Sequence, residues 1–117
     1  MPTDTLTHAP FLDAAAFAAQ VEQVPGLAVV DFTAEHCAPC RMLAPSIDAL
    51  ARDLAGRVTV AKVDADAEPA LTARFGIRGT PTVLFFRDGD VIDRMLGAVP
   101  EARLRAKVQE LRTTPFA

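Results

Sequence analysis

Two cysteines, Cys37 and Cys40, are the residues of this chain whose chemistry follows most directly from type and spacing. A helix that begins at Cys37 would place both sulfurs within one turn, close enough to form a disulfide, and Pro39 would stiffen that turn. The thiolate is the form that attacks a disulfide, and a helix N-terminus favours negative charge. The pattern predicts a redox-active dithiol, in which Cys37 attacks a partner disulfide and the more buried Cys40 resolves the mixed disulfide.

A carboxylate, Asp31, lies in an otherwise apolar run that precedes the cysteines. Burial destabilises the ionised form of a carboxyl group and raises its pKa, so Asp31 is predicted to be the acid–base group that deprotonates Cys40. Lys62 lies in a second apolar run and is predicted to be the buried neighbour of Asp31. The alternative is that Asp31 and Lys62 are satisfied polar groups of the core with no catalytic role.

The segment Arg78-Gly79-Thr80-Pro81-Thr82 comes just before a strongly apolar run. A proline that follows Gly-Thr at the first residue of a strand suits a cis peptide in a tight turn. A cis proline would leave neighbouring backbone groups able to pair with an extended substrate segment. A trans proline in an ordinary loop is the alternative.

The elements that must position these residues follow from the apolar pattern. Buried strands are predicted at residues 27–32, 58–64 and 82–86, with an antiparallel return over 91–96 after Asp88-Gly89 and a short edge strand at 9–12. Helices are predicted at residues 13–24, 37–54 (with a kink at Pro45), 69–76 and from Pro100 onward. This order predicts an α/β fold, a central mixed β-sheet flanked by helices on both faces.

Length and charge limit the other possibilities. A chain of 117 residues predicts one domain, which we place at residues 8–113 between flexible tails at 1–7 and 114–117. A net charge of −3 disfavours nucleic acid, and no apolar run approaches the roughly 18 residues of a membrane span. We see no signal peptide in the sequence, and we expect a monomer in the cytoplasm, where a dithiol is more often catalytic than structural.

Taken together, these motifs resemble the thioredoxin family over nearly the whole chain. The segments that carry the resemblance are Val30-Asp31-Phe32, Cys37-Ala38-Pro39-Cys40, Pro45, Val60-Ala61-Lys62, Arg78-Gly79-Thr80-Pro81-Thr82, Asp88-Gly89 and Gly97-Ala98. The resemblance implies the thioredoxin fold and a protein-disulfide reductase. Cys37 would be its nucleophile, Cys40 its resolving thiol and Asp31 its buried acid–base group.

The resemblance also implies how partners bind. Pro81 would be the cis-proline, Thr80 would pack beside the cysteines, and an apolar rim for partner proteins would consist of Ala38, Pro39, Gly79, Gly97 and Ala98. Disulfide-containing proteins would be the substrates, and an NADPH-dependent thioredoxin reductase would supply electrons. The family needs no bound cofactor.

The chain departs from the family pattern close to the dithiol. Thr33 and His36 stand where the family usually has tryptophans, Ala38 stands where it usually has glycine, and the chain contains no tryptophan. The change at His36 removes apolar docking surface, and a protonated imidazole there would stabilise the Cys37 thiolate and make the pair a stronger oxidant. The alternative is a solvated loop histidine that is mostly neutral at pH 7.

Two other classes of function remain open. A metal site could use Cys37, Cys40, His36 and His8, but adjacent residues can hardly reach one ion and there is no second CxxC, so no metal is predicted. A thioredoxin-like partner-binding or chaperone module with incidental redox activity is the second alternative, because a fold does not determine a function.

Overall fold

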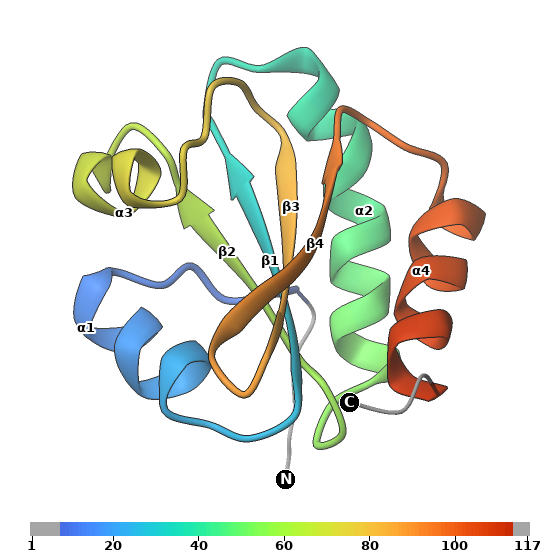
Figure 1. Ribbon diagram of the computed structural model, residues 1–117. Helices are drawn as coiled ribbons and strands as arrows, with labels where there is room; N and C mark the ends of the chain where they lie inside the picture. Colours follow the sequence, from blue (N-terminus) through green and yellow to red (C-terminus); the bar gives the residue numbers. More distant parts are fainter. Residues whose placement is uncertain (1–7, 114–117) are drawn as a thin grey trace, which may run out of the picture.

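The computed structural model describes residues 8–113, the range predicted as a single domain; the predicted tails lie outside the described residues. Four strands form one sheet in the order β2-β1-β3-β4 (Figure 1). Strand β1 pairs in parallel with β2 and antiparallel with β3, and β3 pairs antiparallel with β4. The predicted mixed sheet is therefore confirmed, with strands β1 (Leu27–Thr33), β2 (Thr59–Asp64), β3 (Thr82–Arg87) and β4 (Asp90–Leu96).

Helices cover both faces of the sheet, as predicted (Figure 1). One face carries α2 (Ala38–Asp53) and α4 (Glu101–Thr113), which lie side by side; the other carries α1 (Ala14–Phe17), the π-helical segment η1 (Ala18–Glu22) and α3 (Pro69–Arg74). Successive residues of a strand point to opposite faces, so Val29 packs in the layer with α2 and α4 while Val30 packs in the other layer. Because both faces of β1 are covered, its sequence from Leu27 to Phe32 is apolar on both faces, interrupted only by Asp31.

The edge strand predicted at residues 9–12 is shortened in the structure to a single parallel bridge between Phe11 and Lys62. This segment pairs with β2 only around Lys62, whose amide donates to the Pro10 carbonyl at 2.8 Å and whose carbonyl accepts from the Leu12 amide at 2.8 Å. Proline has no N–H to extend a ladder, and the chain then turns directly into α1. Asp13 caps that helix, and its carboxylate accepts from the Ala16 amide at 2.8 Å.

The predicted helices differ from the structure at their ends: α3 ends at Arg74 rather than at residue 76, and α4 begins at Glu101 rather than at Pro100. The helix predicted at residues 13–24 extends over residues 14–22 and finishes in a π-helical turn, in which the Gln23 amide donates to the Ala18 carbonyl at 3.0 Å. Helix α2 begins after Cys37 and ends at Asp53. It continues through Pro45, which lies inside the helix. Pro39 lies in its first turn, where a backbone N–H would have no intrahelical acceptor.

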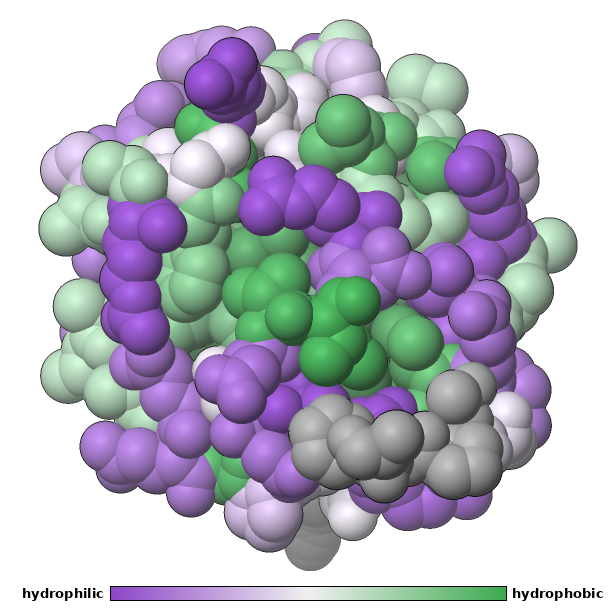
Figure 2. All heavy atoms as spheres, in the orientation of Figure 1, coloured by the Kyte–Doolittle hydropathy of each residue, from purple (hydrophilic) through white to green (hydrophobic). Residues whose placement is uncertain are grey.

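The β3–β4 hairpin returns the chain to the end of the sheet where β1 leads into the loop that carries Cys37. Its predicted turn is confirmed: Asp88 and Gly89 have φ angles of 51° and 88°, the pattern of a two-residue type I′ turn. At the far end of β4, the Gly97 amide donates to the Pro81 carbonyl at 2.9 Å. Strand β4 is the sheet edge with exposed Val91 and Ile92, and Figure 2 shows apolar side chains over this strand.

Candidate redox site

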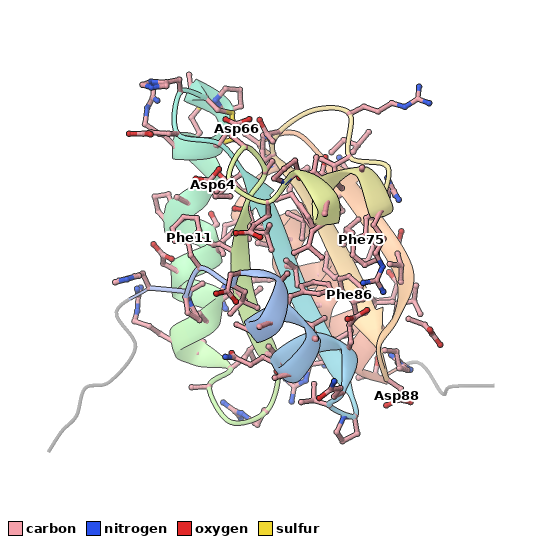
Figure 3. All side chains as sticks on the ribbon, turned by 90° about the vertical axis from the view of Figure 1, so that its left-hand side faces the viewer. Phe11, Asp64, Asp66, Phe75, Phe86 and Asp88 are labelled. Atoms are coloured by element: carbon pink, nitrogen blue, oxygen red, sulfur yellow. A yellow bond between two sulfur atoms is a disulfide. The ribbon has the colours of Figure 1, made fainter. Side chains whose placement is uncertain are left out.

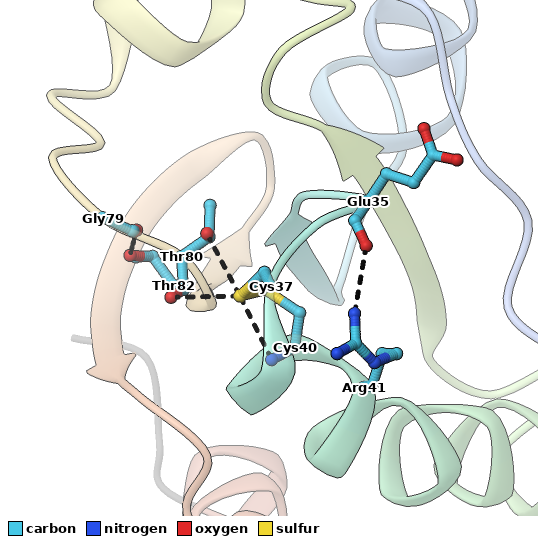
Figure 4. Close-up of a disulfide and its surroundings, with 7 residues drawn as sticks. All are labelled: Glu35, Cys37, Cys40, Arg41, Gly79, Thr80 and Thr82. Carbon is cyan, nitrogen blue, oxygen red and sulfur yellow. Dashed lines mark hydrogen bonds between the residues drawn. A yellow bond between two sulfur atoms is a disulfide. The ribbon is translucent and has the colours of Figure 1, made fainter.

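The loop after β1 places Cys37 at the N-cap of α2. Its backbone is extended (φ −141°, ψ 104°), and its Sγ accepts the Cys40 amide at 3.2 Å (Figure 4). The two cysteines form a disulfide with their Cα atoms 5.2 Å apart. Cys37 is half-buried whereas Cys40 is only 2% exposed, so Cys37 is the sulfur that a partner can reach. This geometry supports the predicted order of attack.

The Cys37 sulfur also lies against Thr80, which comes from the loop before β3 (Figure 4). The Thr80 hydroxyl donates to Sγ at 3.4 Å, and the Thr80 carbonyl oxygen lies 3.5 Å from the same sulfur. With the Cys40 amide, two donors therefore point at Sγ at the N-terminus of α2. In the reduced protein, these donors and the helix dipole would favour a Cys37 thiolate.

The peptide bond between Thr80 and Pro81 is cis, as predicted. The loop is held by the Thr82 hydroxyl, which donates to the Gly79 carbonyl at 2.7 Å. A groove of about 450 Å³ opens beside it, lined by Gly76, Arg78, Gly79, Thr80, Pro81, Thr82, Arg94, Leu96 and Gly97. The structure thus brings four predicted docking residues into one groove.

The other predicted docking residues lie around this groove in different settings. Ala38 and Pro39 are exposed on the first turn of α2. Ala98 is half-buried and packs against the apolar layer of α2 and α4. Reasoning from the sequence missed Arg94, which lines the groove from β4, because a charged residue on an edge strand carries no signal of the groove beside it.

Asp31 is buried, as predicted, with 1% of its surface exposed. Neither carboxylate oxygen has a hydrogen-bond partner in the described part of the chain. Desolvation raises the pKa of Asp31 to about 7, the positive charge of Lys62 opposes that rise, and the negative charge of Asp48 adds to it. Asp31 and Cys40 line a common cavity of about 180 Å³.

Lys62 lies where the sequence predicts, next to Asp31 across the β1–β2 pair, and it is 7% exposed. Its ammonium, however, forms an ion pair with Asp48 of α2, with Nζ to Oδ1 at 2.9 Å. Sequence reasoning missed Asp48. Its spacing from Cys40 was the available signal, since positions 40, 44 and 48 fall on one helical face, and Cys40 and Ala44 both line the cavity of Asp31.

Two of the three departures from the family pattern, Thr33 and His36, lie in the segment just before Cys37. His36 is exposed in the turn just before Cys37. Thr33 is half-buried and lines a cavity of about 280 Å³ together with Phe11, Ala34, Glu35 and Asp64. The loop between them is held by Arg41, whose guanidinium donates to the Glu35 carbonyl at 3.3 Å (Figure 4).

Residues 8–113 contain no group of three or more His, Cys, Asp and Glu side chains arranged to hold a metal ion. Within the same range, no helix has the length and apolar character needed to cross a membrane. The chemistry that this site offers is exchange of its cysteine pair with a disulfide, which is that of a thiol–disulfide oxidoreductase.

Comparison with known proteins agrees with this class. The thioredoxin family model matches residues 9–110. Over 90 residues the chain is 42% identical to thioredoxin of Rhodospirillum rubrum, covering 77% of this chain and 86% of the relative. Over 82 residues, 70% of this chain, it is 48% identical to the M-type chloroplastic thioredoxin of Pisum sativum and 44% identical to that of Zea mays. The chain spans about half the length of these two relatives, 48% and 49%. It belongs to the thioredoxin family.

Proposed function

We propose that this protein reduces disulfides of partner proteins by dithiol exchange, with Cys37 as nucleophile and Cys40 as resolving thiol. The observation that carries the proposal is the difference between the two sulfurs. Cys37 is half-buried with two hydrogen-bond donors on Sγ, whereas Cys40 is 2% exposed and shares a cavity with Asp31. The Cys37 sulfur is therefore accessible to a substrate disulfide, and the Cys40 sulfur is buried behind it.

In the first step the Cys37 thiolate attacks one sulfur of the substrate disulfide. The substrate S–S bond breaks, its second sulfur leaves as a thiolate, and a mixed disulfide joins Cys37 to the substrate. The ionised Asp31 carboxylate then accepts the proton of Cys40, and the Cys40 thiolate attacks Cys37 Sγ. The substrate departs with both sulfurs reduced, and the protein keeps the Cys37–Cys40 disulfide of this structure.

The partner segment would lie along the groove next to Cys37. Thr80, Pro81 and Gly97 line this groove, and the exposed Ala38 and Pro39 flank the nucleophile on α2. Gly79, Ala98 and His36 would complete the contact surface. An extended segment there would be recognised mainly through backbone contacts, which suits a protein that accepts several substrates.

The electron supply, oligomeric state and location are also parts of the proposal. We infer that an NADPH-dependent thioredoxin reductase recharges the dithiol, and that the protein is a monomer without a bound cofactor. We place it in the cytoplasm, because a reducing compartment keeps such a pair in its active form. The resemblance to thioredoxins supports the proposal that a reductase is the electron donor. Cell fractionation tests the proposed location.

Turnover of a small disulfide-bonded protein tests the proposal, with dithiothreitol or a reductase and NADPH as electron source. Cys37→Ser is expected to abolish turnover, whereas Cys40→Ser is expected to accumulate the mixed disulfide, visible on a non-reducing gel. Unchanged turnover in Cys37→Ser would contradict the proposal. A wild-type protein that binds partners without reducing them would instead favour a partner-binding or chaperone module, which the altered docking surface at Thr33 and His36 keeps open.

A further inference from the structure

We propose that Asp48 is a positioning residue of the redox site: its carboxylate holds the Lys62 ammonium, which leaves the Asp31 carboxylate unpaired and able to take the proton of Cys40. This inference rests on the proposed function and adds a residue to it. Asp48 lies on α2 two turns after Cys40, and so places a second carboxylate on the helix that carries the thiols.

The contacts of Lys62 are the first observation. Lys62 and Asp31 are partners in the β1–β2 register, so their side chains leave neighbouring positions of the sheet. The ammonium instead bonds Asp48 Oδ1 at 2.9 Å, while both Asp31 oxygens stay buried without a hydrogen-bond partner among the described residues. A buried carboxylate without a donor holds its proton more tightly and is a stronger base than a paired one.

The second observation is that the Asp48–Lys62 pair is itself fixed by the segment before α1. The Ala9 amide donates to Asp48 Oδ1 at 2.9 Å, so one oxygen receives both the ammonium and a backbone N–H. The Phe11 ring centroid lies 5.4 Å from Lys62 Nζ, and Phe11 sits at the edge where β2 and α2 meet (Figure 3). The segment 9–12 thus contacts both members of the Asp48–Lys62 pair.

The charges of Lys62 and Asp48 shift the pKa of Asp31 in opposite directions. Desolvation raises the pKa of Asp31 most, Lys62 lowers it and Asp48 raises it. Cys40 also lines the cavity, Glu35 and Arg41 complete the set of titratable and charged groups on its walls, and the β3 partner of Asp31 is the apolar Val83. Loss of the Asp48 charge would therefore lower the pKa of Asp31 directly, and again by releasing Lys62.

The substitution Asp48→Asn tests this inference, because asparagine keeps the side-chain size and an acceptor for the Ala9 amide. The Asp31 pKa, followed through its 13C carboxyl signal in the reduced protein, is expected to fall clearly below about 7. The resolving step, followed as release of substrate from the mixed disulfide, is expected to slow by about tenfold at pH 7, part of the roughly 10²–10⁴-fold that a general base supplies.

Three variants control this experiment. Asp48→Glu keeps the carboxylate and is expected to restore the wild-type titration. Asp53→Asn removes an exposed carboxylate of the same helix, one that pairs with Arg105, and is expected to change neither readout. In a Lys62→Met background, the further change Asp48→Asn is expected to shift the Asp31 pKa less than it does in the wild type, because no ammonium remains to be released.

An unchanged Asp31 titration in a folded Asp48→Asn protein would overturn the inference. If that variant does not fold, the wild-type protein still decides: a scalar coupling from the Lys62 ammonium nitrogen to the Asp48 carboxyl carbon supports the inference, and a coupling to Asp31 instead overturns it. Trapping of the mixed disulfide by Cys40→Ser separates a failure of this inference from a failure of the proposed function. Trapping intact with no effect of Asp48 rejects this inference alone, whereas failed trapping rejects the proposed function.

Discussion

The two layers of side chains that cover the sheet are built for different tasks. The layer facing α1 and α3 is aromatic: Phe17, Phe75 and Phe86 form a mutual cluster with ring centroids 5.5–5.6 Å apart, and Phe75 and Phe86 lie side by side in Figure 3. The layer facing α2 is apolar too, but it also contains Asp31 and Lys62. One layer is optimised for packing, while the other includes charges whose burial costs stability and enables chemistry.

The aromatic layer is expected to govern stability alone. Phe86→Ala removes a fully buried ring from the cluster and should lower the free energy of unfolding by about 3–5 kcal/mol. Chemical denaturation measures this loss, with Val91→Ala on the exposed edge strand as a control that costs little. The rate of mixed-disulfide formation in the protein that remains folded should be unchanged. A slower first attack by Phe86→Ala would show that the layers are not separable.

In the layer that faces α2, removal of the buried Asp31 carboxylate is expected to increase the stability of the folded protein. In the unfolded chain Asp31 has a pKa near 3.8, and in the folded protein about 7. Below pH 4 both states hold the proton; as the pH rises to 7 only the folded state keeps it, so the carboxyl lowers stability by an amount that reaches about 4 kcal/mol above pH 7. Asp31→Asn should therefore stabilise the oxidised protein by up to that amount at pH 8.

The same variant should gain little at pH 4, so the pH dependence of its stability between 4 and 7 should be flatter than in the wild type. Denaturation midpoints across this range check the prediction, with Asp53→Asn as the exposed control. A destabilised Asp31→Asn protein at pH 8 would show that the carboxylate has a partner that compensates its burial.

At the hairpin turn, Gly89 lies close to the backbone of Glu22, at the end of η1. A Cβ on Gly89 would lie 2.6 Å from the Glu22 carbonyl oxygen, and its φ of 88° disfavours other residues. Gly89→Ala should cost about 1–3 kcal/mol. Gly56→Ala is the matched control, because Gly56 has a φ of 82° but no atom within 4 Å of its Cβ position. Equal losses in both variants would mean that the contact with Glu22 contributes nothing.

The smallest expected effect concerns the sulfur itself. Thr80→Val removes the hydroxyl that donates to Cys37 Sγ, one neutral hydrogen bond of about 0.5–1.5 kcal/mol. The pKa of the Cys37 thiol should rise by up to about one unit, followed by thiolate absorbance in the reduced protein. Thr80→Ser keeps the hydroxyl and should behave as wild type. A Cys37 pKa that does not change in Thr80→Val would leave the backbone donor and the helix dipole as the stabilising groups.

Local patterns predicted the parts of the fold that local chemistry determines. Asp88-Gly89 defines its own turn, and the apolar runs define β1, β2 and β3 within one residue at each end. The edge strand at residues 9–12 shortens to a single bridge, because pairing depends on a distant partner and Pro10 limits that pairing to the backbone of Lys62.

The site likewise has features that the sequence predicts and features that depend on the folded chain. The cysteine pair and the burial of Asp31 follow from residue type and spacing, and the structure agrees with both. The partner of Lys62 could not be predicted, because two carboxylates, one on a strand and one on a helix, lie within its reach only in the folded chain. A pattern of apolar residues contains no information on which of the two an ammonium will contact.

The pH dependence of the resolving step in a single turnover tests most directly whether Asp31 is the base for Cys40. The rate at which Cys40 releases substrate from the mixed disulfide should rise with pH through an inflection near pH 7, the pKa of Asp31, in the wild-type protein. In Asp31→Asn the rate should be lower and this inflection should be absent. The same inflection in both proteins would contradict the role assigned to Asp31.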